Sequence, residues 1–348
     1  MKHFQIFLFL LGLILISCQP KNTGATLDET IIRIAFGSCG SHQEPLPLLN
    51  VAADKQLDAF IFLGDNVYGD TRDMEVLQKK YEILGNRLEF KKLWNATTVW
   101  ATWDDHDYGE NDAGRHYPFK EESKRLFMDF WKIDQDSDQR NHKGIYGSEY
   151  LKKGDINVQV IILDTRTFRD DLLQRDPKDS IFHKNDYVPN MEADSTFLGK
   201  EQWMWLENEL KVNADIRIIA SSNQFSHEYN GWESWTNVPY EQQKMINLIQ
   251  KTEANAVIFI SGDVHWGEVS KMSIDNGYPL YDVTSSGIVQ TWHHIEPNKN
   301  RIGSAIPQNN IGLIEITHTN GIQVKMSIVD STALPVVSKV VDIDEISF

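Results

Sequence analysis

Residues 102–109 read TWDDHDYG and place three carboxylates and one imidazole in four consecutive positions. They follow residues 97–101 (TTVWA), an apolar and β-branched run that predicts a buried strand. Carboxylates crowded this closely repel one another, and inside a protein they cost free energy unless a cation neutralises them. The segment therefore favours a metal site at a strand end, whereas a solvated loop is the alternative for a single cluster of this kind.

Two other apolar runs end in the same way. Residues 60–63 (FIFL) lead into Asp65, and residues 257–260 (VIFI) lead into Asp263 and His265. In open α/β sheets, ligands bind outside the carboxyl ends of the strands. Three apolar strands that each deliver Asp or His there predict an α/β fold with a metal site at the mouth of the sheet.

The rest of the chain alternates strand-like and helical patterns. Residues 31–36 predict a first strand, residues 45–58 have helical spacing, and the strand 59–63 completes a βαβ unit. Further helices are predicted at 74–93, 119–131, 197–207 and 241–251, and further strands at 144–150, 157–163, 217–220, 278–283, 311–317 and 322–329. Residues 170–195 are polar without a clear period, and we expect a long surface loop or flap over the site.

Composition and charge indicate an acidic globular protein. The chain has 348 residues, of which 41% are hydrophobic, and its formal net charge is −16. Nucleic acid is disfavoured as the main partner, because a phosphate backbone needs neutralisation by Lys and Arg. Without repeats or low-complexity segments, we expect one catalytic domain over residues 31–348, and a monomer.

The amino terminus has the pattern of an export signal. Residues 4–16 are an apolar run behind Lys2 and too short to span a bilayer comfortably, which predicts a signal peptide over residues 1–17. The sequence LISC ending at Cys18 resembles the bacterial lipobox, so we expect lipidation of Cys18 and a polar tether over 18–30. An ordinary signal peptide with a chance cysteine is the alternative. We expect a lipid anchor in the outer membrane of a Gram-negative bacterium, facing the periplasm or the cell surface.

Cys39 is the second of only two cysteines. If Cys18 carries lipid, the Cys39 thiol has no disulfide partner, and it is then either buried and inert or bound to a metal. Thiolate and the phenolate of Tyr68 favour a Lewis-acidic ion such as ferric iron. The carboxylates of Asp105 and Asp263 favour a harder ion such as calcium, with magnesium, manganese or zinc as alternatives. One carboxylate can bridge two ions, and Asp65 is the natural bridge.

Six blocks of the sequence resemble the signature blocks of PhoD-like alkaline phosphatases, a branch of the metallophosphoesterase superfamily. The blocks are 37–39 (GSC), 64–68 (GDNVY), 103–107 (WDDHD), 163–166 (LDTR), 198–203 (LGKEQW) and 262–266 (GDVHW). They occur in the family's order across residues 31 to about 300. The resemblance implies a four-layer α/β/β/α sandwich with mixed sheets, hydrolysis of phosphate monoesters or diesters, and a centre of the iron-plus-calcium type.

The resemblance also assigns roles to single residues. The iron-side ligands of the family are matched by Cys39, Asp65, Tyr68 and His265. The ligands of the second ion are matched by Asp65, Asp105 and Asp263. Asn223 matches a further ligand, with a purely structural amide as the alternative. His106 matches the catalytic histidine, with a structural role as the alternative. Arg166 matches a phosphate-binding arginine, with a surface ion pair to Asp164 or Asp170 as the alternative.

Together these assignments predict in-line hydrolysis of small-molecule phosphate esters. A hydroxide between two ions would attack phosphorus, Arg166 and His106 would stabilise the developing charge, and His106 would protonate the leaving alkoxide. Among the aromatic residues, Trp266 is the first choice for a rim that stacks on an organic leaving group. Trp232, Trp235 and Trp292 are further candidates, with packing in the core as the alternative. The alternatives are a phospholipase or phosphodiesterase acting on lipid head groups, and a non-catalytic surface-binding lipoprotein.

Overall fold

The computed structural model describes residues 30–178 and 187–348. The predicted signal peptide and the tether, apart from Thr30, lie outside these residues, as does part of the predicted flap. Within the described ranges, no helix combines the length and the apolar character needed to cross a membrane.

Two large mixed sheets form the centre of the described part of the chain. One has six strands in the order β15-β14-β13-β1-β2-β3, and the other has seven in the order β12-β10-β11-β9-β8-β5-β4. The strands of the first sheet are β1 (Thr30–Gly37), β2 (Ala59–Leu63), β3 (Thr98–Thr102), β13 (Asn310–His318), β14 (Ile322–Asp330) and β15 (Pro335–Asp342). Those of the second are β4 (Gly147–Lys153), β5 (Ile156–Ile162), β8 (Ile216–Ala220), β9 (Val257–Ser261), β10 (Gly267–Met272), β11 (Leu280–Ser285) and β12 (Arg301–Ile306).

Each sheet contains a parallel group whose strands end at the same edge. In the first sheet β1, β2 and β3 are parallel, and in the second β5, β8, β9 and β11 are parallel. A short bridge between Ser38 and Ser286, directly after β1 and β11, joins the two sheets at this edge. Side chains that follow these strands are therefore brought together at one place.

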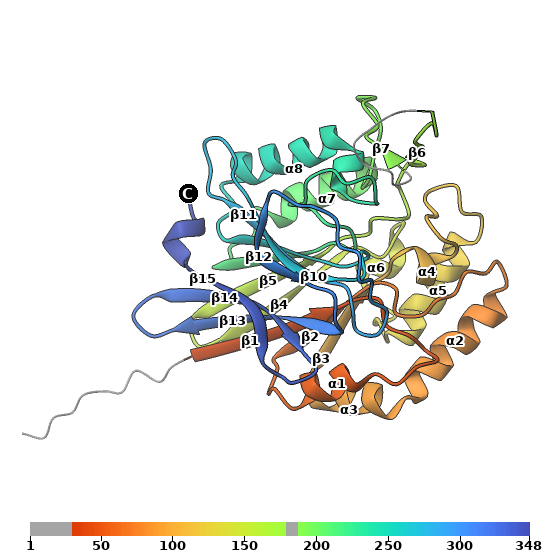
Figure 1. The fold of residues 1–348 in the computed structure, drawn as a ribbon, viewed down its shortest axis with the longest axis horizontal. Coiled ribbons are helices and arrows are strands. Elements are labelled where there is room, and N and C mark those ends of the chain that lie inside the picture. The colour runs from red at the N-terminus through yellow and green to blue at the C-terminus, as the bar shows by residue number, and fades with distance from the viewer. Residues whose placement is uncertain (1–29, 179–186) are drawn as a thin grey trace, which may run out of the picture.

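Helices cover the outer face of each sheet, which gives four layers (Figure 1). The helices α7 (Gly199–Glu209) and α8 (Pro239–Thr252) lie over the seven-stranded sheet, and α1 (Pro47–Ala53), α2 (Met74–Asn86) and α3 (Leu88–Ala96) lie on the other side of the molecule, over the six-stranded sheet. The remaining helical segments are α4 (Asp105–Tyr108), α5 (Lys120–Phe130), α6 (Asp138–Asn141), η1 (Trp235–Asn237) and η2 (Ile343–Ile346). The predicted α/β/β/α sandwich with mixed sheets is confirmed.

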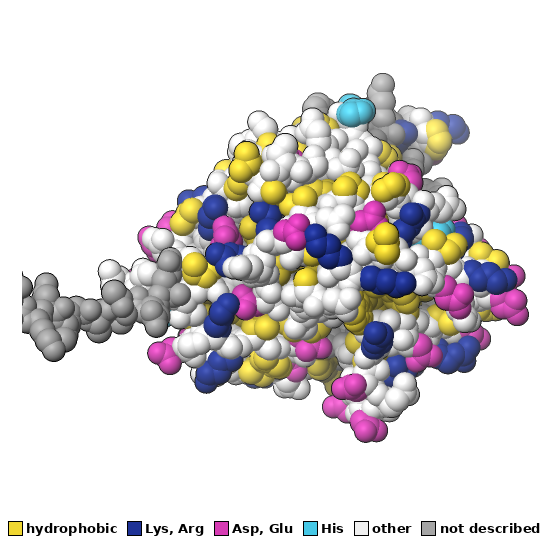
Figure 2. All heavy atoms as spheres, turned by 90° about the horizontal axis from the view of Figure 1, so that it is seen from below, with side chains coloured by type: hydrophobic (Ala, Val, Ile, Leu, Met, Phe, Trp, Pro, Cys, Tyr) yellow, Lys and Arg dark blue, Asp and Glu magenta, His cyan; other side chains and the backbone are white. Residues whose placement is uncertain are grey.

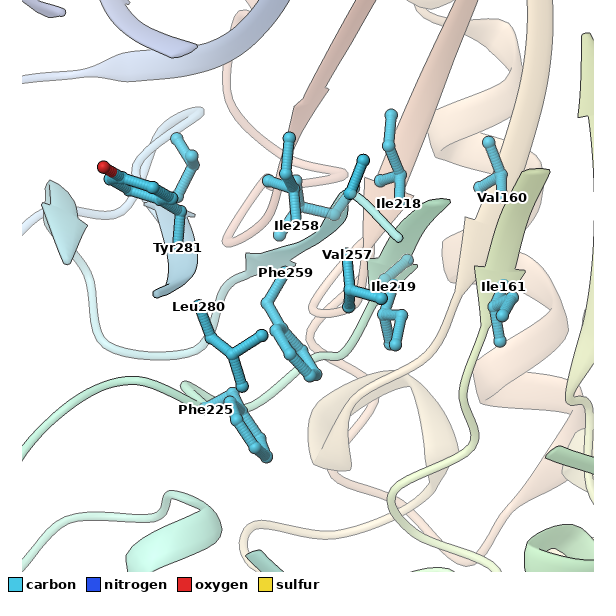
Figure 3. Close-up of a cluster of buried hydrophobic side chains, with 14 of the residues drawn as sticks. Val160, Ile161, Ile218, Ile219, Phe225, Val257, Ile258, Phe259, Leu280 and Tyr281 are labelled. Carbon is cyan, nitrogen blue, oxygen red and sulfur yellow. The ribbon is translucent and has the colours of Figure 1, made fainter. Parts of the chain in front are cut away.

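The central strands are buried on both faces, which explains their continuous apolar sequences. In the seven-stranded sheet, Ile218 and Ile258 point to one side, while Ile219 and Phe259 point to the opposite side (Figure 3). All four are 0% exposed. Phe259 also stacks on Phe225, with ring centroids 3.9 Å apart and 4° between the planes. This packing fixes the strand ends that carry the polar residues of the site.

Several boundaries differ from the sequence predictions. The helix expected over 74–93 is two helices, because Arg87 adopts an extended conformation (φ −61°, ψ 136°) between α2 and α3. The helix expected over 45–58 is only α1. Three strands of the two large sheets, β10, β12 and β15, were not predicted from the sequence. The predicted flap includes two short strands, β6 (Leu173–Gln174) and β7 (Tyr187–Val188), which pair with each other.

The surface carries both signs of charge. On the face seen in Figure 2, the coloured basic and acidic side chains are interspersed, and the basic ones do not merge into one continuous patch. This face therefore does not offer the extended positive surface that nucleic acid requires, in line with the net charge of −16.

Candidate metal centre

The strand ends turn sharply where the predicted ligands lie. Cys39, Asp65, Asp263 and His265 all have positive φ values, of 53°, 51°, 72° and 64°. Residues other than glycine rarely adopt this backbone conformation, and those that do cluster at functional sites. Gly64, with φ of 98°, passes so close to the neighbouring strand end that a Cβ would lie 2.5 Å from the Cβ of Asp104. The backbone is thus held in unfavourable turns that aim these side chains at one region.

Cys39 is a buried free thiol in contact with this region. Its Sγ lies 3.4 Å from Asp65 Oδ2, 3.1 Å from Ser286 Oγ and 3.5 Å from the carbonyl oxygen of Asp263. Burial raises the pKa of the thiol. A protonated, fully buried thiol would be inert, whereas a bound cation would favour the thiolate.

Asp65 lies at the centre of the acidic residues. It belongs to two groups whose ligand atoms lie within 4.8 Å of one another, one with Asp105 and His106 and the other with Asp104 and Asp263. Its Oδ1 is buried and has no hydrogen-bond partner. Burial, together with the nearby Cys39 and Asp105, raises its pKa well above the usual range. This position is the one that a bridging carboxylate would need.

Asp105 and His106 are presented by the first turn of α4. Asp105 accepts a hydrogen bond from the backbone N–H of Asp112 through Oδ2 (2.7 Å), and its buried Oδ1 has no hydrogen-bond partner and lies 3.8 Å from Arg166 Nη2. The Nδ1 of His106 lies 2.7 Å from Asp70 Oδ1. Burial lowers the pKa of His106, but the hydrogen bond to Asp70 and the charges of Asp65 and Asp105 outweigh it and raise the pKa to about 10.

The strand ends of β8 and β9 contribute Asn223, Asp263 and His265. Asn223 donates from Nδ2 to Asp263 Oδ2 (3.2 Å), so its buried Oδ1 is left as an acceptor without a partner. The Nδ1 of His265 lies 3.2 Å from the carbonyl oxygen of Gln290. Since a carbonyl only accepts, Nδ1 carries the proton and the Nε2 lone pair stays available, the usual arrangement of a metal-binding histidine.

Tyr68 is the remaining predicted metal ligand. Its ring centroid lies 4.3 Å from that of His106, and its buried hydroxyl has no hydrogen-bond partner. Burial raises its pKa, and the proximity of Cys39 and Asp65 raises it further.

The residues present fit a metal site. Five buried oxygens have no hydrogen-bond partner: Asp65 Oδ1, Tyr68 Oη, Asp105 Oδ1 and Asn223 Oδ1 of the predicted ligands, and Asp104 Oδ2 beside them. Each such atom costs about 1–3 kcal/mol if it is left unsatisfied. Burial and neighbouring carboxylates also raise the pKa of Asp263 well above its usual range. Cations bound among these atoms would satisfy the oxygens and reverse the pKa shifts.

Arg166 is not the surface residue of the alternative interpretation. Its side chain is 0% exposed and donates from Nε to Asp104 Oδ1 (2.5 Å) and from Nη1 and Nη2 to Glu233 (3.0 and 2.6 Å). Arg169, also buried, pairs with Glu233 as well. The guanidinium of Arg166 is therefore committed to carboxylates, and its assignment to phosphate stays a prediction.

A pocket of about 210 Å³ opens beside these residues. Its lining comprises Asp65, Asp105, His106, Asn111, Asp112, Tyr187, Trp232, Glu233, Asp263, Val264, His265 and Trp292. The expectation that Trp266 forms the aromatic rim is wrong, because its side chain is 0% exposed and does not line the pocket. Trp232 and Trp292 take that place.

Sequence reasoning missed three acidic members of the site. Asp104 contacts Arg166, while Asp112 and Glu233 form a third group with Asp105, again within 4.8 Å. Asp104 and Asp112 flank residues that were singled out, so their proximity in sequence could have included them. Glu233 lies in an aromatic-rich stretch without periodicity, and no sequence signal marks it.

Comparison with known proteins identifies relatives of this chain. The sequence model of the family described as PhoD-like phosphatase matches residues 34–293. Alkaline phosphatase D of Bacillus subtilis (strain 168) is 26% identical over 305 residues, covering 76% of this chain and 50% of that protein, so the chain spans about half the length of this relative.

Solved structures share the fold. A structure of PhoD matches with a TM-score of 0.66 at 18% identity, covering 90% of this chain and 68% of that one. Purple acid phosphatase PPD1 from yellow lupin (Lupinus luteus) seeds matches with a TM-score of 0.57 at 12% identity, covering 90% and 54%. At these identities the likeness concerns the four-layer architecture alone.

Proposed function

The chain belongs to the PhoD-like phosphatase family, and from this premise we propose that it is a metal-dependent hydrolase of phosphate esters. The observation that carries the proposal is the convergence of five strand ends on one buried cluster beside the pocket, where four oxygens of the predicted ligands have no hydrogen-bond partner. A site without ions would leave these groups unsatisfied, at a cost that a purely structural cluster has no reason to bear.

Two sets of side chains would hold the ions. Thiolate, phenolate and imidazole suit ferric iron, and carboxylate and amide oxygens suit calcium. The first set is Cys39, Asp65, Tyr68 and His265, and the second is Asp65, Asp105, Asn223 and Asp263. When bound, such ions supply positive charge for the phosphoryl oxygens and lower the pKa of water.

The protein itself would supply a proton donor and a rigid frame. His106 lines the pocket and is oriented by Asp70, so it is placed to hold a proton for the leaving-group oxygen. Arg166 bridges the fully buried Asp104 and the pocket-lining Glu233 and would act as a positioning residue. It compensates part of the negative charge without contacting substrate.

Diesters are a second candidate substrate class. None of the described residues that line the pocket is Lys or Arg, and five of them are carboxylates. The side-chain cation among the described lining residues is protonated His106, so the second negative charge of a monoester would find no further one there, whereas a diester carries only one charge. This charge balance favours diesters, including glycerophosphodiester head groups, over monoesters of the same alcohol.

The test uses protein purified without chelators. We expect elemental analysis to find iron and calcium in the protein, and turnover of bis(p-nitrophenyl) phosphate, p-nitrophenyl phosphate or both. Glycerophosphocholine is included to test whether lipid head groups are substrates. A folded, metal-containing protein that cleaves none of these esters would favour the non-catalytic lipoprotein, and a folded protein that binds no metal would overturn the proposal.

We also propose a lipid anchor on Cys18 and a location in the outer membrane. The motif LISC and the polar residues that follow it support this. Expression in a Gram-negative host with labelled palmitate should label the wild type and leave the Cys18→Ser variant unlabelled. Recovery of unlabelled wild type from the soluble periplasmic fraction would contradict the proposal.

A further inference from the structure

Two tryptophans from distant parts of the chain meet at the pocket. Trp232 precedes Glu233 in the segment after β8, and Trp292 lies in the loop after β11. Both line the pocket, and their ring centroids are 5.3 Å apart with an interplanar angle of 56°. Trp292 is 41% exposed, which is unusual for a large aromatic side chain beside a polar site.

Both rings are held in place by residues of the site. The ring of Trp292 stacks on that of His265 with centroids 4.5 Å apart and 25° between the planes, and its backbone N–H donates to the His265 carbonyl (2.9 Å). Trp232 is followed directly by Glu233, which is anchored by Arg166 and Arg169. The tryptophans are thus pre-positioned, so a ligand would not have to order them.

Their geometry selects one kind of ligand. The two rings contact each other, so no gap between them can enclose a quaternary ammonium group. Trp292 has one face on His265 and is tilted by 56° against Trp232, and with 41% of the residue exposed we infer that its other face is the one a ligand would meet. A single open indole face favours a flat ring in an offset stack, which contributes about 0.5–1.5 kcal/mol beyond the buried area.

We propose that Trp292, with Trp232 as a side wall, forms a subsite for a planar aromatic ring in the alcohol part of the phosphate ester. This rests on the proposed function, since the subsite adjoins the same pocket. The preferred substrates would then be esters whose leaving group carries such a ring. Because the ring binds outside the group of carboxylates, the subsite would act on substrate binding and leave the chemical step largely unaffected.

The test compares two esters that differ in aromaticity alone. Benzyl phosphate and cyclohexylmethyl phosphate have leaving groups of similar size and basicity, but only benzyl is flat; the corresponding methyl diesters serve if diesters are preferred. For Trp292→Ala we expect both esters to lose the buried area of the indole, and the ratio of kcat/KM for the benzyl ester to that for the cyclohexylmethyl ester to fall about 3- to 10-fold in addition, mainly through KM. Trp292→Phe should retain most of the preference. Tyr240→Ala, which removes an exposed ring outside this pocket, is the matched control and should change neither ester.

Other outcomes separate the subsite from its alternatives. An equal loss with both esters, together with reduced metal content, would mean that Trp292 only packs on His265, and would overturn the subsite. Binding of phosphocholine that weakens in Trp292→Ala, with benzyl binding unchanged, would overturn it in favour of cation recognition. If the wild type cleaves neither these two esters, nor their methyl diesters, nor any ester of the panel above, the proposed function fails; calorimetry with benzylphosphonate and cyclohexylmethylphosphonate then decides the subsite by itself. The subsite stands if Trp292→Ala weakens the binding of benzylphosphonate more than the binding of cyclohexylmethylphosphonate, and otherwise it fails.

Discussion

Two buried aspartates, each at the end of an apolar strand, differ in how their oxygens are used. Asp164 follows β5 and is 0% exposed, and Asp65 follows β2 and is 1% exposed. Both oxygens of Asp164 are saturated by five donors: Trp103 Nε1, the backbone N–H groups of Ile145, Arg166 and Thr167, and the Thr167 hydroxyl. Asp65 has one oxygen without any partner, while the other lies 3.4 Å from the Cys39 thiol.

This difference separates a structural carboxylate from a candidate ligand. N–H donors that surround a carboxylate stabilise its charge and fix the turn, and they leave no lone pair for an ion. A carboxylate that is buried without such donors is stable only if something outside the chain neutralises it. Asp65 and Asp164 therefore make a matched pair, since the same substitution should affect function at one site and folding at the other.

The largest expected effect is that of Asp65→Asn on activity. The amide cannot bridge two cations, so we expect phosphate-ester turnover to fall on the order of 1,000-fold or more, with loss of bound metal measured by elemental analysis. The free energy of unfolding of the metal-free protein should stay the same or rise slightly, because a buried charge without donors is removed. Retained turnover with full metal content would refute the bridging role.

Asp164→Asn should show the opposite pattern. The amide nitrogen that replaces one Asp164 oxygen is itself a donor, so it cannot accept the hydrogen bonds that this oxygen accepts in the wild type. We therefore expect the free energy of unfolding to drop by about 3 kcal/mol. Urea denaturation measures this drop. The folded fraction should keep its metal content and most of its activity per metal. A variant as stable as the wild type but without metal would remove the distinction between the two aspartates.

The sequence alone could predict that strands end in acidic residues, but not which of these are saturated. In the sequence, the blocks around Asp65 and Asp164 look equivalent. The difference is hidden because two of the donors that saturate Asp164, Trp103 and Ile145, are distant from it along the chain. Apolar runs and their order were enough for the parallel strands and the four layers. β15, an edge strand with mostly exposed side chains, has little apolar pattern to detect.

Side chains that act through tertiary contacts also escaped prediction. Glu233 is isolated in sequence, and only the fold brings it to Arg166 and Arg169. For the same reason Trp266 was preferred over Trp292: Trp266 is next to a predicted ligand in sequence, but its side chain turns into the core. Proximity along the chain is a poor guide once a turn of positive φ intervenes, as it does at His265.

Metal removal tests the difference between Asp65 and Asp164 without changing the sequence of the wild type. A ligand that binds only the folded state at 100 times its Kd stabilises that state by about 2.7 kcal/mol. We expect a chelator to lower the free energy of unfolding of the wild type by an amount of this order, as measured by urea denaturation. In Asp65→Asn the chelator should change little, whereas in Asp164→Asn the drop should be as large as in the wild type. Equal stability of the treated and untreated wild type would mean that ions do not stabilise the fold.

Arg166→Lys should have the smallest effect, and it distinguishes a positioning residue from a phosphate-binding one. Lysine keeps the charge but cannot bridge Asp104 and Glu233 with a planar fork. Misplacing residues that support the ligands should lower kcat about 10- to 100-fold, while KM and the inhibition constant of inorganic phosphate stay within about twofold. Arg72→Lys, which alters an exposed pair with Glu110, is the control and should change neither constant. If phosphate inhibition weakens in step with kcat, Arg166 contacts the phosphoryl group. Its ion pairs with Asp104 and Glu233 would then have to open when substrate binds, so these two carboxylates would change partners during turnover.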